Sequence, residues 1–287
     1  MQKNIQNIVF FFDGTPNNYI DVCLQSLRKA SPLCKIFFFY KNPLIKFFYK
    51  KYNIKFMKID KKRSKNKLLF YKVFGVNKVC QTLDDDDLLL VCDVDLLFQS
   101  DPFYMFKEYP EYDLYYTHCI MSKPDSLREE RIWKSVEAKV NGGVWGLRIS
   151  DITRELMNFW VNCEDDKYWD VWDQFFLRKK HLINGLTDLN WFFDQDFLNC
   201  IDLNEVPLSK RLRKIDVGYR YNYFTSTWGF FNLDLNMGRK IGNSNFPIIH
   251  FKDNFKDVFN IKNLKIYNLK NILLKKDLTT ISSRNNI

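Results

Sequence analysis

This sequence lacks the features that mark membrane-spanning, secreted, disulfide-linked and zinc-binding proteins. No stretch approaches the roughly 18 to 20 apolar residues that a membrane-spanning helix needs. The seven cysteines show no C-x-x-C spacing, and their odd number argues against a disulfide framework or a zinc site. The apolar run from Ile8 to Phe12 near the N-terminus is too short for a signal peptide. We therefore expect a cytoplasmic protein with reduced thiols.

The motifs of the commonest nucleotide-binding and hydrolytic enzymes are also missing. The chain contains no P-loop, no dinucleotide-binding G-x-G-x-x-G, no G-x-S-x-G nucleophile elbow and no H-E-x-x-H. These absences exclude most ATPases, dehydrogenases, esterases and zinc proteases. Because neither an internal repeat nor a Gly/Ser-rich linker divides the chain, we expect one domain over residues 1–258 and a basic tail over residues 259–287.

Aromatic and basic residues, by contrast, are abundant. Of the 287 residues, 46% are hydrophobic and 17% are aromatic, which is typical of a globular protein with a full core. The formal net charge is +10, and the segment from Lys35 to Lys72 holds 13 basic residues and one acid, Asp60. Such a surface favours an anionic partner, namely a nucleotide, nucleic acid or an acidic membrane face, although a plain solvated surface is an equally good interpretation.

The first half of the chain alternates short apolar runs with amphipathic segments. This pattern predicts strands over residues 7–13, 34–40, 54–59 and 87–98, and helices over residues 19–30, 43–52 and 67–82. A β-α-β-α order with strands that are apolar on both faces indicates an α/β fold, in which helices cover a mainly parallel central sheet. Ligands bind at the carboxyl ends of the strands in such sheets, and Asp13, Asp93 and Asp95 fall there.

The second half is less regular. It predicts a strand over residues 140–149 that opens with a glycine turn, followed by a helix from about Ser150 to Cys163. A short helix is expected around residues 194–201, and a late strand over residues 246–251. Residues 259–287 hold six basic residues and one acid, with apolar residues at helical spacing. This tail is expected to form an amphipathic helix, either lying on an anionic membrane surface or packed on the catalytic domain.

Two aspartates, Asp93 and Asp95, follow the apolar run that begins at Leu88. Neighbouring ionised carboxylates repel each other and are costly to bury unless a cation lies between them. If the chain turns near Val94, both carboxylates converge on a hard divalent cation such as Mg²⁺ or Mn²⁺. The alternative is that both side chains simply point into water at the end of a strand.

Other polar residues stand at the ends of predicted elements. Asp13 is placed to accept hydrogen bonds from a base or ribose, or to form a turn before Gly14. Asp194 and Gln195 begin a helix, where they would face a cleft or simply cap the helix. His250 ends the late strand, a position at which a lone histidine is more often structural than a ligand.

Taken together, these features resemble nucleotide-sugar glycosyltransferases of the GT-A fold, in particular the retaining family 8 group of galactosyltransferases and glycogenin-like proteins. The likeness spans about residues 7 to 256. It rests on the order of five features along the chain, which are Asp13, the D-V-D of Asp93 to Asp95, the N-G-G-V from Asn141, the D-Q-D-F-L-N from Asp194, and His250 with Lys256.

The resemblance implies a role for each matching residue. It implies a divalent metal, Mn²⁺ or Mg²⁺, bound by Asp93, Asp95 and His250. It implies catalytic positions beside the anomeric carbon for Asp194 and Gln195. The remaining residues implied to bind the nucleotide or the donor sugar are Phe11, Asp13, Lys72, Asn141, Gly142 and Lys256, together with Asp93.

One part of the chain departs from the family pattern. The family's H-x-x-G-x-x-K-P-W appears here as H-F-K-D-N-F-K-D-V from His250. Asp253 replaces the glycine, and Asp257 with Val258 replaces Pro-Trp. The phosphate-binding loop that contains Lys256 is therefore expected to be built differently.

The sequence thus predicts a metal-dependent glycosyltransferase that moves a sugar, with retention, from a nucleoside-diphosphate donor, UDP-linked, to a glycan or related hydroxyl acceptor. One alternative is a sugar nucleotidyltransferase, although that class opens with a glycine- and base-rich loop that "DGTPNN" after the first strand does not provide. A basic nucleic-acid-binding protein is another alternative. The D-x-D and D-Q-D strings would repel phosphate without a metal, so we expect no nucleic-acid partner.

Overall fold

The computed structural model describes residues 4–59, 70–118, 140–162, 197–198, 201–202, 204, 206–226 and 247–252. Three predicted site residues, Asp194, Gln195 and Lys256, lie outside this part of the chain, as does the tail of residues 259–287. The division into a catalytic domain and a tail therefore stays a prediction. Within the described residues, no helix is both long enough and apolar enough to cross a membrane.

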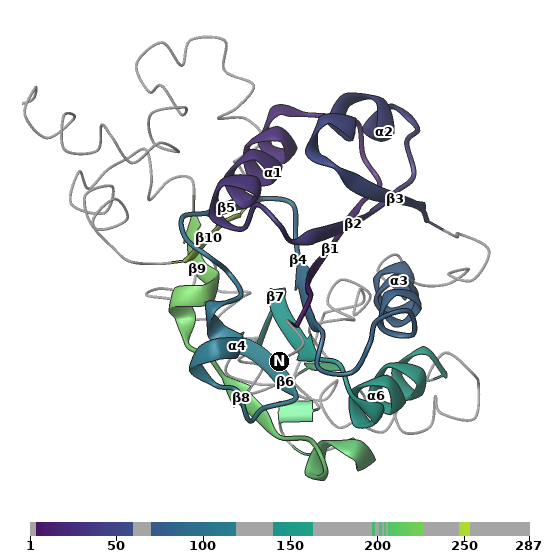
Figure 1. The fold of residues 1–287 in the computed structure, drawn as a ribbon, viewed down its shortest axis with the longest axis vertical. Helices are drawn as coiled ribbons and strands as arrows, with labels where there is room; N and C mark the ends of the chain where they lie inside the picture. The colour runs from purple at the N-terminus through teal and green to yellow at the C-terminus, as the bar shows by residue number, and fades with distance from the viewer. Residues whose placement is uncertain are drawn as a thin grey trace, which may run out of the picture.

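The described residues form two sheets with helices on both faces of the larger one (Figure 1). The strands are β1 (Gln6–Phe12), β2 (Lys35–Tyr40), β3 (Ile54–Lys58), β4 (Leu88–Cys92), β5 (Leu96–Phe98), β6 (Leu114–His118), β7 (Val140–Arg148), β8 (Lys214–Asp216), β9 (Tyr223–Ser226) and β10 (Ile248–Lys252). The α-helices are α1 (Asn18–Ala30), α2 (Leu44–Tyr49), α3 (Phe70–Cys80), α4 (Tyr104–Glu108) and α6 (Asp151–Asn162). Short 3₁₀ helices are η1 (Lys50–Tyr52), η4 (Pro207–Lys210) and η5 (Tyr219–Asn222).

The larger sheet has seven strands in the order β3-β2-β1-β4-β7-β6-β8. The pairs β3–β2, β2–β1, β1–β4 and β6–β8 are parallel, whereas β7 runs antiparallel to both β4 and β6. The predicted α/β fold with a mainly parallel sheet is therefore confirmed. Because β1 lies between β2 and β4, the carboxyl ends of these three strands meet at one edge of the sheet.

Alternate residues of the central strands build two separate cores. Val9 and Phe11 of β1 face α3 and α6, while Ile8 and Phe10 face α1. Figure 1 shows α1 and α4 on one side of the sheet and α3 and α6 on the other. Both faces are covered, which explains why these strands read as continuous apolar runs rather than as alternating ones.

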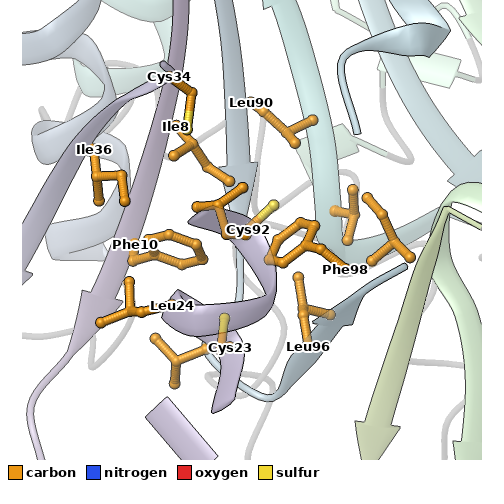
Figure 2. Close-up of a cluster of buried hydrophobic side chains, with 14 of the residues drawn as sticks. Ile8, Phe10, Cys23, Leu24, Cys34, Ile36, Leu90, Cys92, Leu96 and Phe98 are labelled. Carbon is orange, nitrogen blue, oxygen red and sulfur yellow. The ribbon is translucent and has the colours of Figure 1, made fainter. Parts of the chain in front are cut away.

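The core beneath α1 contains three of the cysteines (Figure 2). Phe10 and Phe98 lie edge to face, with ring centroids 6.5 Å apart, and join the central strand β1 to β5. Of the described cysteines, Cys23, Cys34, Cys80 and Cys92 are all free and buried. Burial raises the pKa of Cys34 to about 11, so this thiol is uncharged and unreactive at neutral pH.

The predicted single strand over residues 87–98 is wrong in one respect. The chain leaves the large sheet after Cys92, and Leu96 to Phe98 form β5 in a second sheet of order β5-β10-β9. Strand β10 runs antiparallel to β5, with His250 opposite Leu96. This register brings the end of the chain's described part next to the two aspartates, which no local sequence pattern predicts.

The predicted glycine turn at the start of residues 140–149 is also wrong. Asn141, Gly142 and Gly143 lie inside β7 rather than in a turn, with Asn141 opposite Thr117 of β6 and an irregularity in the β6–β7 register after it. Glycine is disfavoured inside strands unless another group approaches the backbone closely. The side chain that approaches here is a histidine of the candidate site.

Candidate metal site

The break between β4 and β5 determines how the two aspartates are presented. Val94 is 8% exposed and packs into the core below α1, so it anchors the chain between them. The backbone N–H of Asp93 donates to the carbonyl oxygen of Gly143 at 2.9 Å, which continues the pairing of β4 with β7 by one residue. Both carboxylates are partly exposed at the carboxyl edge of the sheet, at 33% for Asp93 and 35% for Asp95. The turn expected near Val94 is therefore present.

The structure brings Asp93 and Asp95 together with His250. One ligand atom from each of the three residues lies within 4.8 Å of the other two. Nε2 of His250 is 3.8 Å from Oδ2 of Asp93 and 3.3 Å from Oδ1 of Asp95. Within the described residues, Oδ1 of Asp95 is buried and makes no hydrogen bond. A buried carboxylate oxygen without a donor is costly, and a cation would satisfy it.

A hydrogen-bonded relay orients the imidazole of His250. Asn222 of η5 donates from Nδ2 to Oγ1 of Thr117 at 2.9 Å, so its Oδ1 faces the histidine. That oxygen lies 3.0 Å from Nδ1 of His250, which must therefore carry the donated proton. Nε2 thereby faces the two aspartates and is the ring nitrogen available to bind a metal. Metal-binding histidines are typically held in this way, through the ring nitrogen that does not bind the metal.

Gly143 allows the histidine to reach this position. A Cβ atom at residue 143 would lie 2.3 Å from Cε1 and 2.6 Å from Nδ1 of His250. The N–H of Gly143 donates to Oδ1 of Asn141 at 2.7 Å, so the strand and the ring fit closely on both sides. The glycine at this position is thus explained by the close approach of His250, not by a turn.

Replacing Asn222 by leucine is expected to weaken Mn²⁺ binding by about 10- to 100-fold, the usual cost of losing a residue that orients a metal ligand. Isothermal titration with Mn²⁺ measures this. Asn158→Leu is the matched control, because Asn158 also accepts hydrogen bonds, from Asn77 and Gln81, but on the exposed surface of α6. Equal affinities in wild type and Asn222→Leu would contradict the relay.

Lys72 projects from α3 to the same edge of the sheet. Its Nζ lies 2.9 Å from Oδ1 of Asp93, and its side chain is only 17% exposed. One turn further along α3, a Cβ atom on Gly75 would lie 2.4 Å from the ring of Phe11. The absence of a side chain at Gly75 therefore lets α3 approach β1 closely enough for Lys72 to reach the aspartate.

The other predicted donor-binding residues occupy different environments. Phe11 is 6% exposed, and its ring stacks on Phe39 with the centroids 4.8 Å apart. Asp13 is exposed just beyond the end of β1. Asn141 and Gly142 are buried in β7, beside Gly143. Their predicted roles toward a nucleotide or a sugar stay predictions, as do those of Asp194, Gln195 and Lys256.

His118, which no sequence motif singles out, is held between two carboxylates at the end of β6. Its Nε2 lies 3.1 Å from Asp202, and its Nδ1 lies 2.9 Å from Asp216. The hydrogen bond to Asp202 and then the one to Asp216 raise the pKa of His118 to about 9, although burial acts in the opposite direction. His118 is therefore a cation at neutral pH, and it joins β6 to β8 and to residues 201–202.

The stability of the protein is expected to fall as the pH rises past this pKa. The folded-state pKa of His118 lies above the ordinary value of 6.5, so the stabilisation is complete below pH 6.5 and is lost as the pH rises through about 9. Urea denaturation of wild type and His118→Gln across this window isolates the contribution. The difference in unfolding free energy between the two proteins should shrink as the pH increases, and a constant difference would contradict the assignment.

Part of this sequence and the fold as a whole are similar to known proteins. A family model described as a nucleotide-diphospho-sugar transferase matches residues 83–184. The galactosyltransferase LgtC, solved with donor and acceptor sugar analogues, is similar in structure with a TM-score of 0.54, at 13% identity over 94% of this chain and 95% of that one. Mouse xyloside xylosyltransferase 1 has a TM-score of 0.54, at 12% identity over 88% of this chain and 99% of that one. No curated protein sequence matches.

The chain therefore has the fold of GT-A glycosyltransferases, and residues 83–184 are similar to nucleotide-diphospho-sugar transferases. The matched segment contains β4, both aspartates and β7, whereas His250 of β10 lies outside it. The resemblance stated from the sequence is confirmed at this level.

Proposed function

We propose that this protein is a metal-dependent, retaining glycosyltransferase that transfers a sugar from a UDP-linked donor to a hydroxyl group of a glycan or related acceptor. The observation that carries the proposal is the convergence of Asp93, Asp95 and His250 within 4.8 Å at the carboxyl edge of a GT-A sheet. A diphosphate brings negative charge to a site that already holds two carboxylates. Such a donor needs a cation to bind there.

The ligand set suits a particular kind of cation. Two carboxylates favour Mg²⁺, Ca²⁺ or Mn²⁺, and an imidazole nitrogen shifts that preference toward Mn²⁺. When bound by Asp93, Asp95 and His250, the ion would neutralise the diphosphate and act as a Lewis acid on the leaving group. The three residues fit the ion for two reasons. Oδ1 of Asp95 is buried and makes no hydrogen bond within the described residues, and the contact of Nδ1 with Asn222 orients Nε2 of His250 toward the ion.

The proposal gives the remaining roles to the other predicted site residues. Lys72 pairs with Asp93 and is placed to contribute positive charge to the diphosphate. Asp13 beyond β1 would bind the nucleoside, and Asn141 with Gly142 would face the donor sugar. Asp194 would supply negative charge beside the developing oxocarbenium ion, and Gln195 would orient the substrate, because an amide is a poor base.

A panel of UDP-sugars tests the proposal. With Mn²⁺ present, the protein is expected to release UDP slowly from one member of the panel, and chelation by EDTA should stop the release until Mn²⁺ is restored. Asp95→Asn is expected to be inactive on every donor. Release of UDP that is unaffected by EDTA, or a protein that binds neither UDP nor any UDP-sugar, would contradict the proposal.

The stereochemistry of transfer tests the roles given to Asp194 and Gln195. With an α-linked donor, NMR of the first-formed product should show an α-linkage. Asp194→Asn should lose far more kcat than donor affinity, and Gln195→Ala should lose less. A β-linked product would mean that the transfer inverts and that these two roles are wrong.

A further inference from the structure

The short helix α2 has an apolar outer face that the rest of the described chain does not cover. Ile45 and Tyr49 point into the core and are 0% and 3% exposed. On the opposite face, Leu44, Phe47 and Phe48 are 52%, 68% and 54% exposed. The described residues contain five exposed large hydrophobic side chains in all, so three of them gather on these two turns of helix. An exposed cluster of this kind indicates an interaction surface.

This face is rigidly held. The hydroxyl of Tyr49 receives a hydrogen bond from the backbone N–H of Asn17 at 2.9 Å and donates one to the carbonyl oxygen of Asn17 at 2.7 Å. Helix α2 is thereby fixed to the start of α1, at the outer end of the sheet near the edge strand β3 (Figure 1). The rings of Phe47 and Phe48 contact each other edge to face, with centroids 5.6 Å apart. The apolar face is therefore preformed.

Exposed lysines lie on α2 and directly after it. Residues 31–59 contain seven lysines and no aspartate or glutamate, and all seven lysines are exposed. Lys46 lies within α2, and Nζ of Lys50 lies 5.6 Å from the ring centroid of Phe47. Lys51 is partly neutralised by Asp21 of α1, at 2.8 Å. The surface defined by Leu44, Phe47, Phe48, Lys46 and Lys50 is called the α2 surface below.

We propose that the α2 surface docks on a lipid bilayer that contains anionic lipids. The two phenylalanines and Leu44 would enter the boundary between headgroups and acyl chains, and the lysines would lie against the lipid phosphates. An anionic bilayer offers an apolar layer to Leu44, Phe47 and Phe48 and phosphates to the lysines. A nucleic acid offers phosphates but nothing apolar for Leu44, and a second copy of the chain would set lysines against lysines.

Vesicle sedimentation of the full-length protein tests the proposal. Wild type is expected to bind vesicles that contain phosphatidylglycerol and to leave vesicles of pure phosphatidylcholine unbound. Removing a phenylalanine that is buried on binding costs about tenfold or more in partitioning, so Phe47→Ser with Phe48→Ser should lose at least that factor. Lys46→Glu with Lys50→Glu should lose binding to the anionic vesicles to a similar extent.

Tyr104→Ser is the matched control, because Tyr104 is another exposed aromatic residue, 54% exposed, but lies on α4. It should bind vesicles as wild type does.

Equal vesicle binding by wild type and the double serine variant would overturn the proposal. The proposal would also be overturned if the wild type formed a dimer, or bound a single-stranded oligonucleotide, and the serine substitutions abolished that association. Either result would assign the α2 surface to a second copy of the chain or to nucleic acid. The variants are read out by binding alone, so failure here leaves the proposed transferase activity untouched.

Discussion

Asp95→Asn is expected to abolish Mn²⁺-dependent binding of UDP while leaving the protein folded. Oδ1 of Asp95 is buried, has no hydrogen bond among the described residues and lies 3.3 Å from Nε2 of His250. Loss of a ligand should cost more than the roughly 10- to 100-fold seen when a supporting residue is lost. Because the substitution also removes one of two like charges, the metal-free variant should be at least as stable as the metal-free wild type.

Asp93→Asn should lose UDP binding to a similar extent but for a less simple reason. Asp93 also pairs with Lys72 at 2.9 Å, so its neutralisation weakens that ion pair as well. Asp95→Asn is therefore the cleaner variant. Asp101→Asn is a matched control, since Asp101 lies beyond β5, contacts Lys107 at 3.5 Å and lies outside the metal cluster. Titration of UDP with and without Mn²⁺ measures all three, and wild-type affinity in Asp95→Asn would contradict the site.

Gly143→Ala is expected to cause nearly as large a loss as removal of a ligand. The new methyl group would overlap the imidazole of His250, with contacts of 2.3 and 2.6 Å, and the ring must move away. Since the ring is also fixed by Asn222, its displacement breaks the relay and moves Nε2 from the aspartates. We expect the Mn²⁺-dependent affinity for UDP to fall by about 100-fold, at the upper end of the cost of misplacing a metal ligand.

The same strand supplies the control for this substitution. Gly146→Ala is similarly crowded, with contacts of 2.7 Å to the ring of Phe106 and 3.2 Å to the carbonyl oxygen of Leu89. It should lower the free energy of unfolding by about 1–3 kcal/mol, the usual cost of overpacking, and leave metal binding intact in the folded protein. Equal effects of the two substitutions on Mn²⁺ affinity would show that Gly143 acts through general stability and not through His250.

Much of the fold was predictable because its central strands carry strong local signals. The apolar runs of β1 and β2, the start of β4 and the amphipathic pattern of α1 were placed within one residue. The strand over residues 87–98 was predicted as continuous because Val94 and Leu96 are as apolar as the residues before Asp93. Only the pairing of β5 with β10 shows that the chain changes sheets there.

The residues of the candidate site were likewise predictable only in part. Asp93 and Asp95 were singled out by their spacing at a strand end, and His250 was predicted as a ligand only through the family resemblance; the structure brings the three together. Thr117 and Asn222 were missed, since they stand 105 positions apart in the sequence and only tertiary contacts connect them. Gly143 was read as part of a turn, because its true neighbour, His250, is far away in the sequence.

The central claim is that one divalent cation is bound by two carboxylates and an imidazole, and pulsed electron paramagnetic resonance with Mn²⁺ tests it most directly. Wild type in the presence of UDP should bind one ion per chain, with a nitrogen coupling from Nε2 of His250 and a phosphorus coupling from the diphosphate. His250→Ala should lose the nitrogen coupling, and Asp95→Asn should lose the bound ion. A bound Mn²⁺ without nitrogen coupling in wild type, or one that survives unchanged in both variants, would contradict the account.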